Sequence, residues 1–246
     1  MKTPNDLFSR LKKLIPSNIK PKFESGEELL AWNQEQGRLR SEAILLENRA
    51  MKMQRVMGRS GIRELYMNCS FDNYRVENNG QRKALNLARE YAAKFENSIA
   101  SFVFTGRPGT GKNHLSAAIG NDLILRGKSV VILTVADLMS SMKSTFNGSS
   151  SVTEQRLLHD LSHVNLLVID EIGIQSESRY EKVIINQIVD RRSSSKRPTG
   201  MLSNLDPSSM NALLGERVMD RMRLGNSLWV RFDWESYRSR IRGDEY

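Results

Sequence analysis

A-S-F-V-F-T-G-R-P-G-T-G-K-N-H, residues 100–114, is the stretch that decides the fold. Its apolar run at 102–104 predicts a buried strand, and apolar residues recur at helical spacing from 115 to 125. A glycine-rich loop that ends at Lys112 lies between the two. Strand, glycine loop, lysine and helix in this order are typical of a phosphate-binding P-loop. The loop residues that we expect to contact a nucleotide are Arg107, Pro108, Gly109, Thr110, Gly111, Lys112, Asn113 and His114.

The chemistry of this loop suits a triphosphate. Gly106, Gly109 and Gly111 allow tight turns in which backbone N–H groups point inward. The N-terminus of the following helix adds partial positive charge, and Lys112 adds a full charge. An ordinary glycine loop before a helix is the alternative, but the flanking elements and a second motif downstream favour a P-loop. We therefore expect ATP or ADP as the ligand.

Asn113 departs from the usual pattern, which has Ser or Thr after the lysine to bind Mg²⁺ through a hydroxyl. An amide oxygen is also a hard ligand for magnesium, and a water can bridge an amide to the ion. The sequence therefore still predicts Mg²⁺, with Asn113 and Asp170 as its expected ligands. An adaptor that binds nucleotide without turnover is the alternative that this departure supports.

A second motif, N-L-L-V-I-D-E, occupies residues 165–171. Four apolar residues predict a buried strand, and two acids stand at its C-terminal end, where ligands bind in parallel sheets. Asp170 is placed to hold Mg²⁺, and Glu171 is placed to polarise the water that attacks the γ-phosphate. The alternative, that the acids merely end a strand, is disfavoured by the P-loop upstream.

Two further sets of polar side chains extend the predicted site. Asn204 follows a predicted strand, so its amide either orients the attacking water or caps the turn that comes next. Arg217 and Arg221 lie one helical turn apart and share a face in an arginine-rich segment. An ion-pair lattice with the neighbouring acids, Glu216 and Asp220, is the alternative for these two arginines.

The composition is that of a basic, moderately apolar chain. Its 246 residues carry a net charge of +9, and 39% of them are hydrophobic. This positive balance favours nucleic acid or another acidic partner, although solubility alone would also explain it. Cys69 is the only cysteine, which excludes an internal disulfide and suits a reducing cytoplasm. We see no signal peptide and no membrane-length apolar run, so we expect a cytoplasmic protein without a membrane partner.

The rest of the α/β part alternates predicted helices and strands. Further strands are expected at 129–135, 199–203 and 229–232. Val183 and Ile184 are among the residues that should face inward from one of the helices. Parallel strands separated by helices imply a doubly wound α/β domain. The expected helices span residues 81–95, 136–146, 153–163 and 178–193.

Residues 1–60 predict a small helical domain with a glycine linker, and residues 61–246 predict the α/β domain. A short amphipathic helix is expected at 1–15 and a long charged helix at 27–57. Two helices this polar cannot bury all their apolar side chains against each other, so a protein partner is favoured over self-packing alone. The residues that we expect to face this partner are Leu7, Phe8, Leu11, Leu29 and Trp32.

Aromatic side chains indicate two further contacts. Cys69 and Phe71 belong to the predicted ATP-binding set, with Phe71 and Tyr74 as candidates for the wall of an adenine pocket. Packing under the sheet edge is the alternative for these two rings. Phe146 and Lys143 are candidates for binding single-stranded DNA, since a ring stacks on a base and a lysine meets a phosphate. Burial in the core is the alternative for Phe146.

The motifs together resemble those of AAA+ ATPases of the DnaC/IstB group. The resemblance rests on G-R-P-G-T-G-K-N-H, L-L-V-I-D-E, a strand that ends in Asn, and G-E-R-V-M-D-R-M-R, and it covers nearly the whole chain. Asparagine after the P-loop lysine also resembles a variant of this group. The resemblance implies a five-stranded parallel sheet flanked by helices, preceded by a small N-terminal helical domain.

Helicase loaders of this group grip the hexameric replicative helicase, of the DnaB type, with their N-terminal helices. They assemble side by side in a spiral, bind ATP, open the helicase ring for single-stranded DNA, and leave after hydrolysis. The resemblance implies these activities for this chain, with an ATPase that is weak alone and stimulated in the helicase–DNA complex. Transposition helper ATPases of the IstB kind are the alternative, although residues 1–63 resemble the helicase-binding part of a loader.

The resemblance also implies a role for each polar residue of the site. Lys112 matches the Walker A lysine, and Asp170 and Glu171 match the Walker B pair. Asn204 matches the sensor 1 residue. These matches agree with the roles that the residue types and their positions indicate.

Three arginines complete the implied site. Arg221 matches the arginine finger that reaches the γ-phosphate of the neighbouring subunit, with Arg217 beside it. Arg238 matches the sensor 2 arginine. Phosphoryl transfer depends on positioning and on charge stabilisation, and an arginine supplied in trans meets the second need.

Overall fold

The chain divides into two compact units, Met1–Leu45 and Leu46–Tyr246. The domain boundary predicted after residue 60 lies outside the described residues, as do the predicted glycine linker and the predicted helix at 1–15, so these stay predictions. The residues that the computed structural model describes are 23, 25–56, 66–146, 153–174 and 178–237.

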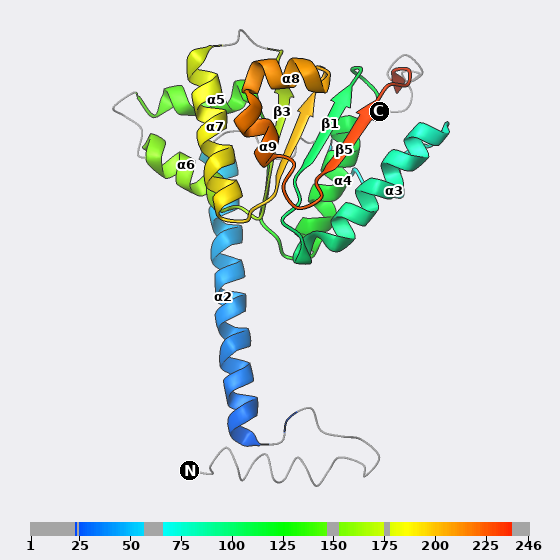
Figure 1. Ribbon diagram of the computed structural model, residues 1–246. Coiled ribbons are helices and arrows are strands. Elements are labelled where there is room, and N and C mark those ends of the chain that lie inside the picture. The colour runs from blue at the N-terminus through cyan, green and yellow to red at the C-terminus, as the bar shows by residue number, and fades with distance from the viewer. Residues whose placement is uncertain (1–22, 24, 57–65, 147–152, 175–177, 238–246) are drawn as a thin grey trace. The chain divides into compact units, whose positions relative to one another are not determined.

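Helix α2, Gly26–Val56, is the long charged helix predicted at 27–57 (Figure 1). Its first turn is capped by Ser25, whose Oγ accepts a hydrogen bond of 3.1 Å from the N–H of Glu28. Arg38 forms ion pairs along the helix with Glu35 and Glu42. Such solvent-exposed i,i+3 and i,i+4 pairs stabilise a helix only weakly.

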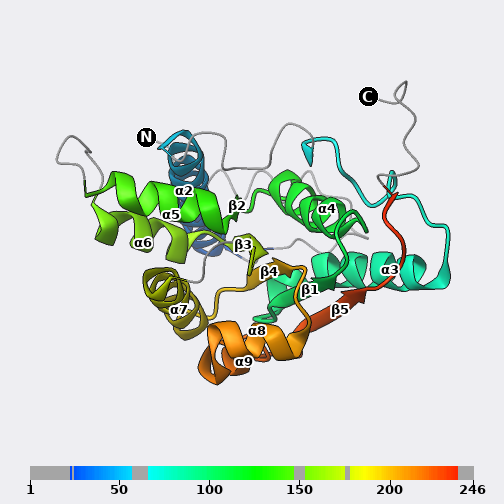
Figure 2. The same cartoon turned by 90° about the horizontal axis from the view of Figure 1, so that it is seen from above.

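The five described strands of the second unit are all parallel, in the order β2-β3-β4-β1-β5 (Figure 2). This confirms the predicted five-stranded parallel sheet. Parallel strands need crossover connections, and the predicted helices provide them. The strands are β1 (Phe102–Gly106), β2 (Val130–Thr134), β3 (Leu166–Ile172), β4 (Thr199–Ser203) and β5 (Leu228–Phe232).

Helices cover both faces of the sheet (Figure 2). Helices α3 and α4 pack on one face and contribute to one core cluster, whereas α5 to α9 contribute to the cluster on the other face. A short 3₁₀ helix, Phe95–Asn97, follows α3. The bounds are α3 (Asn79–Lys94), α4 (Lys112–Leu125), α5 (Val135–Ser144), α6 (Glu154–His163), α7 (Arg179–Ser194), α8 (Pro207–Leu214) and α9 (Glu216–Arg221).

Successive residues of each strand alternate between the two clusters. In β1, Phe102 and Phe104 point to the cluster with α3 and α4, and Val103 points to the other. This is the side-chain alternation of a strand that is buried on both faces. Helix α7 buries Ile184, as predicted, but Val183 is 44% exposed, so its predicted inward position is wrong. One residue is 100° of helix rotation, which is enough to move a side chain off the buried stripe.

The arginine-rich segment near the end of the chain is interrupted rather than continuous. Helix α8 ends at Leu214 and α9 begins at Glu216, with Gly215 between them at a φ of 85°. Glycine adopts this left-handed conformation without the steric cost of a side chain. The N-cap of α8 is Asp206, which accepts from the N–H of Ser209.

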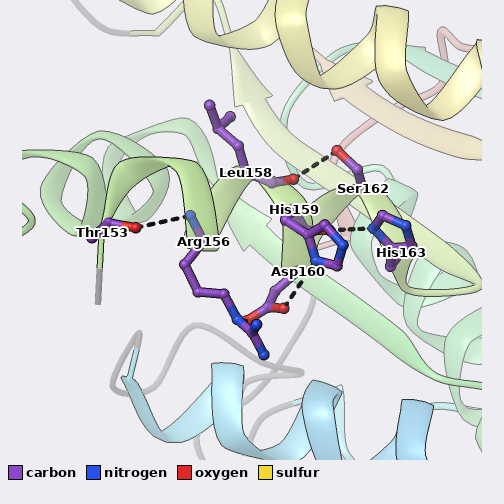
Figure 3. A network of polar contacts seen from close by, with 7 residues as sticks. All are labelled: Thr153, Arg156, Leu158, His159, Asp160, Ser162 and His163. Carbon is purple, nitrogen blue, oxygen red and sulfur yellow. Dashed lines mark hydrogen bonds and ion pairs between the residues drawn. The ribbon is translucent and has the colours of Figure 1, made fainter. Parts of the chain in front are cut away.

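Figure 3 shows a network of polar contacts between neighbouring turns of α6. Thr153 caps it by accepting from the N–H of Arg156, whose side chain pairs with Asp160 at 3.2 Å. The rings of His159 and His163 stack at 3.9 Å. The contacts join residues at most four apart, so this network stabilises the helix itself. No helix in the described part of the chain is both long and apolar enough to cross a bilayer.

Candidate active site

Four of the predicted catalytic residues lie at the carboxyl edge of the sheet, where β1, β3 and β4 end: Lys112, Asp170, Glu171 and Asn204. Lys112, the first residue of α4, is only 6% exposed. Its Nζ donates hydrogen bonds to the carbonyl oxygens of Gly106 and Arg107, both at 2.7 Å, and to Oδ1 of Asn204 at 2.9 Å. The structure thus places Asn204 beside the P-loop lysine, while Asp206 takes the capping role that was the alternative for Asn204.

Asn113 and Asp170, the predicted metal ligands, are in direct contact. The Nδ2 of Asn113 donates to Oδ2 of Asp170 at 2.6 Å, and Asp170 is 9% exposed. One carboxylate and one amide, next to a loop that suits phosphates, match the oxygen donors that Mg²⁺ uses in nucleotide sites. Since O and N of an amide are exchanged by a simple flip, Asn113 is able to present its oxygen to a cation. The residues present therefore fit a magnesium ion.

Glu171 occupies a strained position at the end of β3. Its φ is 61°, a left-handed conformation that is uncommon for residues other than glycine. The pairing with β4 slips here by one residue, since Ile169 pairs with Met201 but Ile172 pairs with Ser203. Such strain costs about 1–3 kcal/mol and clusters at functional sites. The backbone N–H of Glu171 donates to Oδ1 of Asp170 at 2.6 Å, so the two acids are linked at this edge of the sheet.

Two glycines of the P-loop are required by close approaches of other groups. A Cβ on Gly106 would lie 2.1 Å from the carbonyl oxygen of Phe232, and its φ is 121°. A Cβ on Gly111, with a φ of 94°, would lie 2.9 Å from the ring of Tyr74. The P-loop is therefore packed closely against both β5 and the segment that precedes α3.

The segment from Tyr66 to Tyr74 lies across the start of α4. Asn121 of α4 donates from its Nδ2 to the carbonyls of Tyr66, Met67 and Cys69 at 2.8–3.1 Å. His114 lies 3.1 Å from the carbonyl oxygen of Ser70 through its Nε2. These contacts bring the predicted ATP-binding residue Cys69 next to the P-loop helix.

Burial shifts the titration of two groups in this region. It lowers the pKa of His114 below its ordinary range, opposed by the hydrogen bond to Ser70, because the imidazolium loses hydration. It raises the pKa of the Cys69 thiol for the corresponding reason. Both groups are therefore neutral near pH 7, and the positive side-chain charge at the loop comes from Lys112 and Arg107.

The two aromatic candidates for an adenine wall differ in burial. Tyr74 is buried in the core cluster, where its ring lies edge-on to His114 at 5.3 Å, so it packs under the P-loop. Phe71 is half-buried, with the guanidinium of Arg89 5.8 Å from its ring centre. The contact of Phe71 with adenine stays a prediction.

Arg217 and Arg221 converge on one carboxylate, that of Asp190 in α7. Each arginine forms an ion pair of 2.6 Å with a different oxygen of this group. Arg221 lines a pocket together with Ser101 and Thr199, which stand where β1 and β4 begin. The P-loop follows the opposite end of β1, about 16 Å away for five residues at about 3.3 Å each. Neither arginine is therefore close to the nucleotide site of its own chain, and Arg238 lies outside the described residues.

The candidates for single-stranded DNA are on the surface. Phe146 is 63% exposed, so the alternative that it is buried in the core is wrong. Its ring centre is 6.2 Å from that of Tyr180, the second residue of α7. Lys143 is exposed near the end of α5. The exposed ring of Phe146 beside the half-buried ring of Tyr180 offers a surface on which a base can stack.

The predicted partner-facing residues fall partly on α2. Trp32 is 39% exposed, and its ring centre is 5.3 Å from that of Phe23. Leu29 is half-buried. The other three candidates, Leu7, Phe8 and Leu11, lie outside the described residues.

Three residues of the site region were missed by the sequence reasoning. Tyr180 lies beside Phe146, Asp190 holds both candidate finger arginines, and Trp234 donates to the P-loop carbonyl of Thr110. Each reaches its partner across 27 to 124 residues of chain, for example 27 between Asp190 and Arg217. Local periodicity carries no signal for such contacts.

Comparisons with known proteins agree with this geometry. A family described as IstB-like ATP binding protein matches residues 31–244. The replicative helicase loader DnaC of Buchnera aphidicola subsp. Schizaphis graminum is 72% identical over 242 residues, 98% of each chain. The DnaC of Escherichia coli (strain K12) is 67% identical over 246 residues, 100% of each chain.

Solved structures show the same fold at lower identity. A crystal structure of the DnaC helicase loader matches with a TM-score of 0.59 and 22% identity, and covers 68% of this chain and 99% of that chain. The match shows the fold of the ATPase part. The chain belongs to the family of the replicative helicase loader DnaC, among the IstB-like ATP binding proteins.

Proposed function

We propose that the chain is an ATP-dependent loader of a hexameric replicative DNA helicase of the DnaB type. It binds the helicase through its N-terminal helices and opens the ring for delivery onto single-stranded DNA at replication initiation or restart. Hydrolysis of ATP then releases it. The observation that carries the proposal is the convergence of Lys112, Asp170, Glu171 and Asn204 at one edge of the sheet. Relatives that are 67–72% identical over nearly the whole chain and named as loaders support it.

ATP and ADP bind at the P-loop in this proposal. Lys112 turns its ammonium from Asn204 to the phosphates, and the glycine-rich backbone supplies N–H donors. Mg²⁺ neutralises phosphate charge when bound, and Asp170 and Asn113 are the residues that would hold it.

Glu171 and Asn204 act on the attacking water. The carboxylate accepts a hydrogen bond from the water and polarises it, and the amide fixes its direction. Glu171 has a positive φ of 61°, unlike Asp170 beside it. In this proposal the two adjacent acids take different parts in one reaction.

Arg221, with Arg217 beside it, acts on the nucleotide of a neighbouring chain. Both lie at the opposite end of the sheet from their own P-loop, so a spiral of chains is needed to bring them to a γ-phosphate. Asp190 holds the two guanidinium groups together until then. Hydrolysis is consequently weak for the free chain and stimulated in the assembled helicase–DNA complex, where Arg238 adds the sensor 2 contact.

Partner contacts come from two surfaces. The helicase is bound by apolar residues of the N-terminal helices, including Leu29 and Trp32 with Leu7, Phe8 and Leu11. Single-stranded DNA is bound at Phe146 and Lys143, and the half-buried ring of Tyr180 beside Phe146 extends the stacking surface. A role as an IstB-type transposition helper is less favoured, because the named loaders align with the first residues of this chain as well.

A loading assay tests the proposal. The host's helicase is offered a closed circle of single-stranded DNA, with the chain, ATP and Mg²⁺, and helicase retained on the circle is measured. Wild type should load it, and Lys112→Met should not, although this variant retains the length of the side chain. Equal loading by Lys112→Met, or loading without any nucleotide, would refute an ATP-dependent loader.

A further inference from the structure

The segment that follows β5, residues 233–237, is tied to the P-loop by two hydrogen bonds; we call it the tail segment. The indole Nε1 of Trp234 donates to the carbonyl oxygen of Thr110 at 2.9 Å. The backbone N–H of Tyr237 donates to the carbonyl oxygen of Gly109 at 2.8 Å. Both acceptors belong to the part of the loop that has to bind phosphate.

A hydrogen bond that orients a backbone carbonyl also orients the N–H group of the following residue, because both belong to one peptide unit. A trans peptide is planar, so its C=O and N–H point in opposite directions. The bond from Tyr237 therefore directs the N–H of Thr110 away from the tail segment, and the bond from Trp234 does the same for the N–H of Gly111. Two successive N–H groups on one side of a loop form the concavity that binds anions.

The neighbouring peptides are oriented by other partners. The N–H of Arg107 donates to the carbonyl of Phe232 at 3.0 Å, and the carbonyl of Gly111 accepts from the N–H of Leu115 at 3.1 Å in the first turn of α4. Without the tail segment, these bonds would hold the two ends of the loop. The tail segment holds two peptides between these ends, Gly109–Thr110 and Thr110–Gly111.

The two donors are themselves held by packing. The ring of Trp234 packs at a tilt of 46° against Phe232, with centres 4.9 Å apart, and lies against Gly80 of α3, where an added Cβ would be 3.1 Å from it. The guanidinium of Arg75 lies 5.5 Å from the ring centre of Tyr237 and hydrogen-bonds its hydroxyl. Donors anchored in this way orient the loop at little cost in entropy when a ligand arrives.

We propose that Trp234 and Tyr237 are positioning residues for the phosphates of the bound nucleotide. They act through the loop, by holding the N–H groups of Thr110 and Gly111 in the direction that phosphate oxygens require. The inference rests on the proposed binding of ATP at the P-loop. It predicts an effect on affinity that depends on phosphates and leaves the fold unchanged.

Trp234→Phe is the test variant, because it retains an aromatic ring and removes the N–H donor. Trp229→Phe is the matched control, since Trp229 is a half-buried residue of β5 that packs near Arg223. The dissociation constants for ATP, ADP and adenosine are measured by calorimetry on the full chain, with the midpoint of thermal unfolding measured without nucleotide. The loss of one hydrogen bond predicts weaker binding of ATP and ADP by about 3–10-fold. Adenosine affinity should stay unchanged, and the unfolding midpoint should fall by no more than a few degrees, as expected for the loss of one hydrogen bond.

Tyr237→Pro and Tyr237→Ala form a second pair. Both remove the phenol, but only proline removes the backbone N–H, so ATP affinity should fall further for proline than for alanine. Unchanged affinity of Trp234→Phe for ATP, or an equal loss for adenosine, would overturn the inference. Wild-type protein that binds no ATP would instead refute the proposed function on which the inference rests.

Discussion

At the P-loop charged side chains are buried, whereas along α2 large apolar side chains are exposed. Lys112 is 6% exposed and Asp170 is 9% exposed, yet both have hydrogen-bond partners. Trp32 and Ile44 of α2 are 39% and 57% exposed. Among the α2 side chains that the structure describes, the other exposed large apolar residues are Leu30, Leu39, Leu45 and Met51.

The buried charges at the P-loop and the exposed apolar side chains of α2 indicate two different functions. Buried charge costs free energy unless it is paired, so its presence at a sheet edge indicates chemistry on a charged ligand. Exposed apolar side chains repeated along one helix indicate a partner that covers them. The comparison predicts that variants in the two regions separate ATP turnover from helicase binding.

The largest effect is expected for Arg221→Ala. Loss of an arginine supplied in trans should lower ATP turnover in the assembled complex by about 10³-fold, with ATP affinity unchanged. Arg223→Ala is the control, because this neighbouring arginine packs near Trp229 instead. Turnover is measured with helicase and single-stranded DNA present. If Arg221→Ala hydrolyses ATP as fast as wild type in the presence of helicase and DNA, the arginine finger is Arg217 instead.

Glu171→Gln should lower turnover by about 10²-fold, because the amide cannot accept the proton of the attacking water. ATP binding should persist, and the loaded complex should be trapped, which gel filtration detects. Asp206→Asn is the matched control, since asparagine caps α8 as well as aspartate does. Normal turnover in Glu171→Gln would remove Glu171 from the mechanism.

Trp32→Ala tests the other region. Truncation of an exposed aromatic anchor should weaken helicase binding by about tenfold or more, with ATP affinity unchanged. Gln34→Ala, a change at an exposed polar position of the same helix, should leave binding as it is. If the two variants bind the helicase equally well, Trp32 is not part of the interface.

The smallest effect is expected from pH. Burial lowers the folded-state pKa of His114 below the unfolded value of about 6.5, so the folded state binds fewer protons in that range. Stability should therefore fall as the pH drops below about 6.5, and His114→Gln should reduce this loss. The ring is partly solvated, so the difference in unfolding midpoint should not exceed a few degrees, the shift caused by about 1 kcal/mol. Identical pH profiles of the two proteins would show that His114 does not titrate in this way.

Local sequence patterns predicted much of the fold and the centre of the site. Runs of apolar residues predicted β1, β3 and β4, because each of these strands is buried on both faces. The glycine loop, the two acids and Asn204 were then located from the ends of these runs. Since parallel strands share a carboxyl edge, the positions of Lys112, Asp170 and Asn204 follow from their places in the chain.

The contacts that were not predicted are those made between distant segments. Asp190 receives two arginines from another helix, and Trp234 reaches Thr110 across 124 residues. The outward position of Val183 and the break at Gly215 depend on which neighbours pack against α7 and α9. The left-handed backbone of Glu171 results from a register slip between two strands, which neither strand encodes alone.

The most direct test of the account is co-elution of the purified chain with the host's hexameric replicative helicase, with ATP and Mg²⁺ present. The same experiment is done with a version that lacks residues 1–60, whose ATP binding is measured to show that its P-loop is intact. The account predicts a complex with the full chain, and none with the shortened chain although it still binds ATP. A full chain that binds ATP and single-stranded DNA but forms no complex would contradict the loader function.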